Sequence, residues 1–326
     1  KWHVAPLKPA RAYGCKKHLS PFAINSVKQA RQYISSSKDQ PFYLEMNFMQ
    51  NHRPVPSYAF KQHPDFPVDP DTIHVPDYWA LPDWPEIRED VAAYYSQARW
   101  RDALIGQVMD HLEHEGLAEN TMVLFESDNG PMYPGGIGHV YDRGIATPLI
   151  LHWPAGLPAG RTVHGLTSTI DLMPTALAAA GAAIPGTVQG QSLLPAARGH
   201  TDAVHDAVFA EMTYHVEHTA MRAIRTEQYK YIENLNDTPV GLDMCETFDW
   251  AQRVAELPGQ PCCRPRPPEE LFDIQADPTE QNNLAADPAM ADDKKKLRER
   301  VHAWRRRTKD PVTDGWPAGR PRKLPP

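Results

Sequence analysis

Apolar residues in the first part of the chain recur with the helical period in three places. The clearest is the segment 89–115, where apolar side chains return every three or four residues until Gly116. This spacing lines them up on one face of a helix, which a glycine can end. Shorter helices are predicted over residues 25–35 and 168–180, the second ended by Gly181.

Short apolar runs lie between these helices and predict buried strands over residues 42–48, 122–125 and 149–153. Strands that alternate with helices favour an α/β fold, in which a mostly parallel central sheet is flanked by helices and its strands end at the active site. The Pro-rich stretch 53–85 shows no periodicity. An irregular loop of this length inside a compact domain is usually functional.

The pattern changes near residue 205. Short alternating segments joined by polar turns predict a small antiparallel sheet, with strands over residues 207–210, 221–225 and 229–232. A final helix over about 288–307 carries Leu297, Val301 and Trp304 on one side and is expected to pack against that sheet. We therefore expect a catalytic α/β domain over residues 1–205 and a small C-terminal α+β subdomain over residues 206–326.

The composition fits a globular protein and excludes some classes of function. Of the 326 residues 41% are hydrophobic, and the formal net charge is −7. The chain can therefore bury a large core, and it offers no broad basic surface for nucleic acid. The basic runs at residues 294–296 and 305–307 fall in the predicted final helix and are interpreted as a solvated face. No run approaches the roughly 18 apolar residues of a membrane span.

The most informative motif is Ser127-Asp128-Asn129-Gly130, which follows the predicted strand 122–125. A carboxylate and an amide carbonyl are hard oxygen donors suited to Ca²⁺ or Mg²⁺, and α/β enzymes keep their chemistry where strands end. An Asp-Asn-Gly sequence is also typical of an Asx turn that closes a strand. The motif by itself leaves both interpretations open.

Four segments, at residues 1–4, 51–54, 127–130 and 141–150, have an order and spacing that resemble the sulfatase family, a branch of the alkaline-phosphatase superfamily. Four more segments narrow the resemblance to the heparan N-sulfatases, the N-sulfoglucosamine sulfohydrolases: residues 211–215, 221–225, 270–274 and 277–284. The last of these carries an Asp-Pro-x-Glu-x-x-Asn-Leu pattern, here called the tail motif, which resembles the closing pattern of sulfatases.

The resemblance implies hydrolysis of a sulfate ester or sulfamate on sulfated glycans, and it assigns roles to particular residues. Lys1 and His3 would contact the sulfuryl oxygens and the formylglycine hydroxyl, respectively. His52 would bind the sulfuryl group or act as an acid toward the leaving group. Asp128 and Asn129 would be two oxygen ligands of a Ca²⁺, with Mg²⁺ as an alternative.

Two further residues are assigned to the sugar. Glu211 and His215 fall in the segment that, by the resemblance, reaches from the small domain toward the substrate. They are equally well interpreted as polar residues of an antiparallel edge. In either case the expected partner of the whole protein is a sulfated glycan or a small sulfated sugar, and not nucleic acid.

The family's nucleophile has no counterpart in this chain. Sulfatases make formylglycine from Cys or Ser in a Cys/Ser-x-Pro-Ser-Arg motif upstream of the segment that matches Lys1, where they also carry two metal-binding aspartates. The sequence Cys263-Arg264-Pro265-Arg266 lacks the Ser-Arg and lies far on the other side of Asp128. We therefore expect the chain to be the C-terminal two-thirds of a larger enzyme, inactive without an N-terminal segment.

One departure from the family pattern concerns anion binding. Sulfatases carry a Lys or Arg four residues before the Tyr that aligns with Tyr141, and this chain has Ile137 there. Three explanations remain open. His139 or Arg143 reaches in instead, the alignment slips in the glycine-rich loop, or the site binds a group of different or lower charge.

The cysteines and the compartment give weaker expectations. A bridge from Cys245 to Cys262 or Cys263 would close a short loop in an oxidising compartment, which agrees with the extracytoplasmic habit of sulfatases. A homodimer is possible. Two alternatives to a sulfatase stay open: a phosphodiesterase or phosphonate hydrolase of the same superfamily, and a non-catalytic fragment or paralogue that binds anionic glycan.

Overall fold

The computed structural model describes residues 23–54, 57–79, 81–214, 218–237, 247–258 and 265–312. The chain divides into two compact units that are interleaved in sequence. The first comprises residues 1–74, 88–123 and 152–156, and the second comprises 75–87, 124–151 and 157–326. The domain boundary expected at residue 205 stays a prediction.

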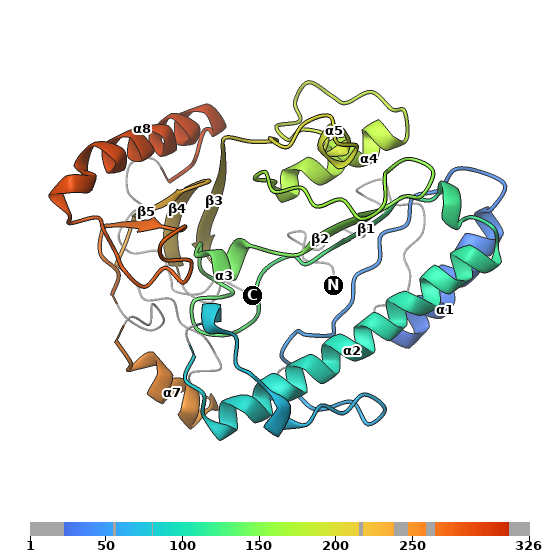
Figure 1. Ribbon diagram of the computed structural model, residues 1–326, viewed down its shortest axis with the longest axis horizontal. Coiled ribbons are helices and arrows are strands. Elements are labelled where there is room, and N and C mark those ends of the chain that lie inside the picture. Colours follow the sequence, from blue (N-terminus) through green and yellow to red (C-terminus); the bar gives the residue numbers. More distant parts are fainter. Residues whose placement is uncertain are drawn as a thin grey trace. The chain divides into compact units, whose positions relative to one another are not determined.

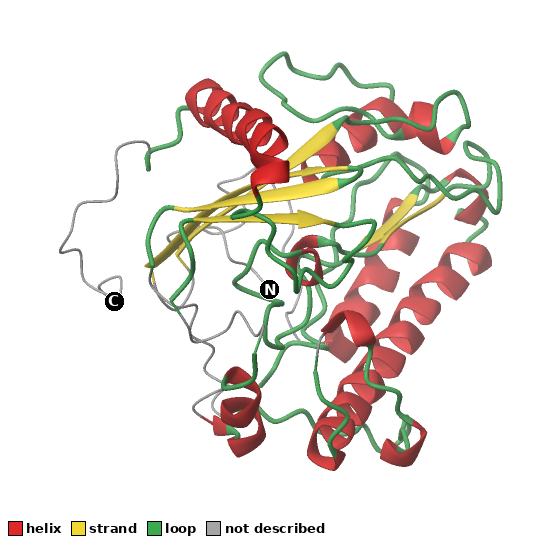
Figure 2. Ribbon diagram, turned by 60° about the vertical axis from the view of Figure 1, so that its left-hand side comes forward, coloured by secondary structure: helices red, strands yellow, loops and turns green. Residues whose placement is uncertain are grey.

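Two long helices form the core of the first unit. They are α1 (Ala23–Ser37) and α2 (Pro85–His114), which belongs to this unit from Arg88 onward. Both views show them side by side (Figures 1 and 2). Apolar side chains face inward from each helix, among them Ile34 and Val91, which are almost fully buried. The helices predicted over residues 25–35 and 89–115 are confirmed, and Gly116 follows α2 with a φ of 70°.

The predicted strand 42–48 is wrong. The segment is extended, and the exposure of its side chains alternates, with Tyr43 exposed and Leu44 half-buried. No strand ladder includes it within the part of the chain that is described. Alternation reports an extended backbone with one buried face, whereas a strand also needs a neighbouring segment to pair with its backbone.

The strands β1 (Val123–Glu126) and β2 (Leu149–His152) form a two-stranded sheet. The sheet belongs to the second unit except for Val123 and His152, which are assigned to the first. Both strands were predicted. The predicted helix 168–180 begins as a 3₁₀ turn, η5 (Thr169–Asp171), and continues as α4 (Leu172–Ala179). A shorter helix, α5 (Leu194–Ala197), follows.

The predicted antiparallel sheet is confirmed and has a fourth strand. Its order is β3-β4-β5-β6, with antiparallel pairing throughout. The strands are β3 (Ala207–Tyr214), β4 (His218–Thr226), β5 (Tyr229–Asn234) and β6 (Glu269–Asp273). Neither β6 nor the helix α7 (Asp249–Ala255) was predicted as an element.

Both faces of this sheet bury apolar side chains, and different segments cover them. On one face, Leu297 and Val301 of α8 (Ala291–Thr308) pack with Tyr231, as the final helix was predicted to do (Figure 2). On the other face, Val140 and Tyr141 pack against β4, β5 and β6. The second contact matters for function, because these two residues belong to the loop that follows Asp128.

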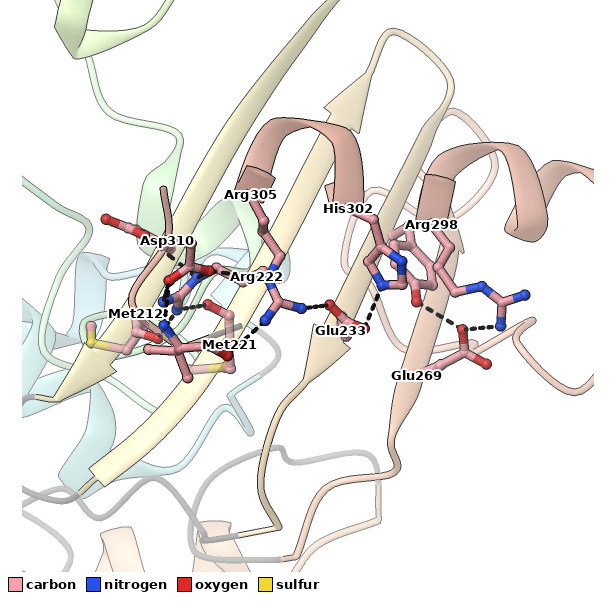
Figure 3. A network of polar contacts seen from close by, with 12 residues as sticks. Met212, Met221, Arg222, Glu233, Glu269, Arg298, His302, Arg305 and Asp310 are labelled. Atoms are coloured by element: carbon pink, nitrogen blue, oxygen red, sulfur yellow. Dashed lines mark hydrogen bonds and ion pairs between the residues drawn. The ribbon is translucent and has the colours of Figure 1, made fainter. Parts of the chain in front are cut away.

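A buried ionic network fixes the end of α8 to the sheet (Figure 3). Asp310 accepts hydrogen bonds at 2.8 Å from both Nε and Nη2 of Arg222 on β4, and one at 3.0 Å from Arg305. Arg305 also contacts Glu233 of β5 at 2.6 Å, and His302 contacts the same carboxylate at 2.8 Å.

No helix in the described parts of the chain is long and apolar enough to cross a membrane.

Replacing Asp310 with Asn should lower the free energy of unfolding by about 3 kcal/mol at pH 7, since two buried guanidinium groups lose their shared carboxylate. Hydrogen bonds from Arg222 hold the pKa of Asp310 at about 2. A depressed carboxyl pKa stabilises the folded protein above the unfolded value of about 3.8, and this contribution is lost as pH falls toward 2. Urea titrations of the wild type and the variant at pH 7 and near pH 2 measure the difference in the free energy of unfolding.

Asp206→Asn is the control for this experiment. Asp206 pairs with Arg300 at 2.6 Å, but its side chain is 88% exposed, so its loss should change stability by less than about 1 kcal/mol. Equal losses in the two variants would show that burial does not strengthen the network around Asp310.

Candidate active site

The loop that follows β1 carries two side chains whose oxygen atoms could bind a metal ion and have no partner among the described residues. Asp128 is exposed, and its carboxylate has no hydrogen-bond or ionic partner among the described residues. Asn129 donates its side-chain N–H to the carbonyl of Gly130 at 2.7 Å, which leaves its Oδ1 available. An Asx turn would use the Asp128 carboxylate to accept a backbone N–H, and the structure contains no such bond.

These donors suit a hard cation in kind but not yet in number. Ca²⁺ takes six to eight oxygen ligands, and Asp128 with Asn129 supplies two. Within the described ranges, no group of three or more His, Cys, Asp or Glu side chains could hold a metal ion. The two side chains therefore fit a Ca²⁺ site in kind, and the described residues do not complete one.

Gly130 fixes this loop against a helical turn, α3 (Asp142–Ile145). Its N–H donates to the carbonyl of Gly144 at 2.9 Å. A Cβ at Gly130 would lie 1.9 Å from the carbonyl oxygen of Arg143, which is well inside van der Waals contact. Only glycine allows the two backbones to approach this closely.

Arg143 does not supply the basic group that is missing at Ile137. Its guanidinium is buried and donates to the carbonyls of Trp79 at 3.0 Å and Thr279 at 3.3 Å. Trp79 in turn stacks on Tyr133, with ring centroids 4.6 Å apart. Arg143 therefore joins the Pro-rich loop to the segment after Asp128, and both of its terminal nitrogens donate within the fold.

His139 does not supply a charge either. Its side chain is buried, and neither ring nitrogen has a hydrogen-bond partner in the described structure. Burial, together with the positive charges of Arg266 and Arg143, lowers the pKa of His139 to about 3. The ring is thus neutral at pH 7, and the first of the three explanations for Ile137 is excluded.

The His139 pKa predicts a loss of stability in mild acid. The folded pKa of about 3 lies below the unfolded value of about 6.5, so the unfolded chain binds a proton that the folded chain refuses. The contribution of His139 to the free energy of unfolding is complete above about pH 6.5. It decreases as pH falls, with a limiting slope of about 1.4 kcal/mol per pH unit. His139→Phe should flatten the dependence between pH 6.5 and 5.

Urea titrations across that window measure the slope, so that a constant packing cost of the larger ring cancels. His164→Phe, at an exposed position, is the control and should keep the wild-type slope. An unchanged slope in His139→Phe would contradict the account of this buried ring.

The first unit presents His52 on a rigid turn. The side chain is exposed, and Nδ1 donates to the carbonyl of Arg53 at 2.7 Å, which leaves Nε2 as the outward nitrogen. The turn is anchored to α2 on both sides of the histidine. Asn51, with a φ of 70°, donates to the Tyr94 carbonyl at 2.8 Å, and Arg53 makes a bidentate contact with Asp90 at 2.9 and 2.5 Å.

Arg53 is a buried residue whose structural role the sequence did not reveal. It is 1% exposed, and its guanidinium lies over the Phe60 ring at 4.3 Å. The Asn-His-Arg-Pro segment was recognised as a unit, but nothing in it distinguishes a buried arginine from one that contacts substrate. Asp90 is 37 residues away, and its charge on an amphipathic helix looks like an ordinary solvent-facing position.

Glu211 lies on β3 opposite Arg222 of β4. Its side chain is 59% exposed, and Oε2 is 3.4 Å from the buried Nε of Arg222. The carboxylate is thus accessible to a ligand while a fixed cation stands behind it. Lys1, His3 and His215 lie outside the described residues, as do all four cysteines. Of the predicted site residues, the structure brings Asp128 and Asn129 together, whereas His52 belongs to the other unit.

A second polar group behind the loop was also missed. Tyr141 donates its hydroxyl to Glu270 of β6 at 2.6 Å, and Asn234 of β5 donates to the same carboxylate at 2.6 Å. Burial raises the pKa of Glu270, while burial and the adjacent Glu270 raise that of Tyr141. Both residues stood in recognised segments, but their contact joins positions 129 residues apart, which local pattern cannot show.

Two family models match this chain. The sulfatase model matches residues 22–182, and the model of the C-terminal part of N-sulphoglucosamine sulphohydrolase matches residues 138–258. Together they span more than half of the chain. The chain belongs to the sulfatase family. The resemblance to sulfatases that its sequence segments indicate is confirmed.

Individual relatives agree with this assignment. Human N-sulphoglucosamine sulphohydrolase is 29% identical over 325 residues, covering 86% of this chain and 64% of its own length. An ulvan-active sulfatase of Formosa agariphila is 29% identical over 244 residues, covering 71% of this chain and 40% of its own. The chain therefore spans only part of the length of these sulfatases.

A solved structure described as a 2-O GAG sulfatase superposes with a TM-score of 0.59 at 22% identity, covering 91% of this chain and 66% of that one. At this identity the match shows the fold. The predicted α/β architecture of the sulfatases is thereby confirmed.

Proposed function

We propose that the protein is a sulfuric ester or sulfamate hydrolase for sulfated glycans, of the N-sulfoglucosamine type, with a formylglycine nucleophile contributed from upstream of Lys1. The observation that carries the proposal is the pair of unengaged oxygen donors on Asp128 and Asn129, at the end of a strand in a sulfatase chain. The match to the N-sulphoglucosamine sulphohydrolase C-terminal model supports the substrate class.

The chemistry requires a held anion, a nucleophile and an acid for the leaving atom. A Ca²⁺ at Asp128 and Asn129 would supply positive charge for the sulfuryl oxygens and the nucleophile. His52 is proposed to act on the leaving group, because its Nδ1–H is fixed by the Arg53 carbonyl and its Nε2 is left for the substrate. Lys1 and His3 are proposed to contact the sulfuryl group and the nucleophile.

Glu211 and His215 are proposed to bind the sugar. The exposed carboxylate of Glu211 can accept hydrogen bonds from sugar hydroxyls or an amino group, and Arg222 restricts its direction. Binding energy from the sugar, remote from sulfur, would then position the reacting bond. Sulfated glycans are extracellular or lysosomal materials, so an extracytoplasmic location is part of the proposal.

A phosphodiesterase or phosphonate hydrolase of the same superfamily is the second candidate. It is favoured by one observation, namely that neither Arg143 nor His139 provides a cation in place of the basic residue absent at Ile137. A phosphodiester or phosphonate monoester carries one negative charge, as a sulfate ester does, but presents two terminal oxygens in place of three, so a site with one cationic contact fewer would suit it.

The 326-residue chain alone should release no sulfate from a sulfated glucosamine, since it lacks the Cys/Ser-x-Pro-Ser-Arg motif that supplies the formylglycine nucleophile. The protein extended upstream, with the maturation that makes formylglycine, should turn over the substrate. Sulfate release is measured against a buffer blank. Turnover by the chain alone would contradict the proposed nucleophile, and phosphodiester cleavage without sulfatase activity in the extended protein would favour the second candidate.

In the extended protein, Asp128→Ala and Asn129→Ala should weaken Ca²⁺ binding and lower kcat together, because a hard-cation site depends on ligand number and charge. Glu299→Ala, which removes an exposed carboxylate on α8, is the control for net charge and should change neither. Calorimetric titration with Ca²⁺ measures the affinity. Wild-type affinity in both loop variants would make the motif an ordinary turn.

Glu211→Ala should lower kcat/KM for an N-sulfated glucosamine by about tenfold or more while sparing a small aryl sulfate, for which the sugar contacts are idle. Glu227→Ala, an exposed carboxylate at the turn between β4 and β5, should leave both values unchanged. Equal losses of kcat/KM on both substrates in Glu211→Ala would assign this residue to folding. The proposal would then be limited to a sulfatase of unspecified substrate.

A further inference from the structure

The tail motif is far in sequence from the loop that carries Asp128, yet it contacts the turn on which that loop rests. We propose that Glu280 of this motif is a positioning residue for the loop 128–130, acting through Asp142 and Gly144. The proposal rests on the proposed function only in assigning that loop to a cation site. All of the contacts that carry it lie within the second unit.

The first step joins the tail motif to α3. One oxygen of the Glu280 carboxylate accepts the backbone N–H of Asp142 at 2.6 Å. The other lies 3.0 Å from Nζ of Lys230, which also contacts the Asp142 carboxylate at 2.5 Å. The side chains of Glu280 and Lys230 are 1% and 0% exposed. A charged, buried hydrogen bond of this kind is stronger than an exposed one and holds the first residue of α3.

The second step joins α3 to the loop. The Gly144 carbonyl accepts the N–H of Gly130, and the Gly130 Cα faces the Arg143 carbonyl too closely for any side chain. Arg143 is itself held by the Thr279 carbonyl, the residue before Glu280. A shift of α3 is therefore passed to Gly130, and from Gly130 to the adjacent donors of Asn129, because the backbones have no free space between them.

The backbone of the tail motif is strained at the residue that makes these contacts. Glu280 has a φ of 56°, in the left-handed region that glycine occupies without cost. Asp277 holds the turn by accepting the N–H groups of Gln281 and Asn282, both at 2.8 Å. A glycine would relieve the strain but would remove the carboxylate. The strain thus accompanies a side chain whose contacts reach the site.

The test compares Glu280→Ala and Glu280→Gln with Asn283→Ala in the extended protein. Asn283 belongs to the same motif, but its side chain accepts the N–H groups of Leu271 and Ala285 and does not touch α3. The readout is amide hydrogen exchange at Gly130, alongside global stability from urea titration. Glu280→Ala should speed exchange at Gly130 by about tenfold or more beyond the change in global stability, the effect of losing a charged hydrogen bond.

Glu280→Gln keeps an oxygen that can accept the Asp142 N–H, so its exchange at Gly130 should stay within about threefold of wild type. Asn283→Ala should lower global stability without a selective change at Gly130. The proposal is overturned if Glu280→Ala and Asn283→Ala change Gly130 exchange equally, or if neither changes it. In that event Glu280 serves the fold only.

Ca²⁺ titration of the same variants separates this proposal from the proposed function. A selective increase in amide exchange at Gly130, together with weakened Ca²⁺ affinity in Glu280→Ala, supports both the positioning role and the cation site. Selective exchange in a protein whose wild type binds no Ca²⁺ supports the positioning role and contradicts the cation site. The exchange measurement stands without any metal present.

Discussion

The buried ion pair between Lys230 of β5 and Asp142 of α3, at 2.5 Å, is the contact on which the second unit's site depends. Lys230 is fully buried, and an ammonium group in that position is costly unless carboxylates surround it. Burial alone would raise the pKa of Asp142, but Lys230 and Arg225 hold it below its ordinary value. The lysine therefore requires a charged partner at the start of α3, and it places that turn on the sheet.

Burial separates the polar groups that build each unit from those that are free to bind. Arg53, Arg143 and Arg222 are all buried, and their guanidinium groups are bonded to carbonyls or carboxylates within the protein. Asp128 and Glu211 are exposed carboxylates. A family pattern marks all five as noteworthy, but only groups with unfilled hydrogen-bonding capacity can engage a ligand without first breaking a structural contact.

The sequence predicted the elements whose signal is local. The period of α2 and its end at Gly116, the alternating strands of the antiparallel sheet, and the Leu297–Val301 face of α8 each follow from residues close together in the chain. The segment 42–48 was misassigned because its alternation shows an extended backbone and says nothing about a pairing neighbour.

The candidate site was predicted in part, for the same reason. The Asp128 motif follows an apolar strand and could be found locally. The roles of Arg143 and Glu280 depend on contacts with Thr279 and Asp142, over 136 and 138 residues of sequence. Motif recognition located these positions, but it could not decide whether a basic residue faces a ligand or the interior. That decision requires the burial and the hydrogen-bond partners.

The central claim is that the Asp128–Asn129 loop is half of a cation site held in place by the C-terminal sheet. A crystal structure of the extended protein grown with Ca²⁺ tests this most directly. We predict a cation within about 2.3–2.6 Å of an Asp128 carboxylate oxygen and of Asn129 Oδ1, with the Gly130–Gly144 hydrogen bond intact. The account would be contradicted if the loop held no cation and the Asp128 carboxylate instead accepted a backbone N–H of its own turn.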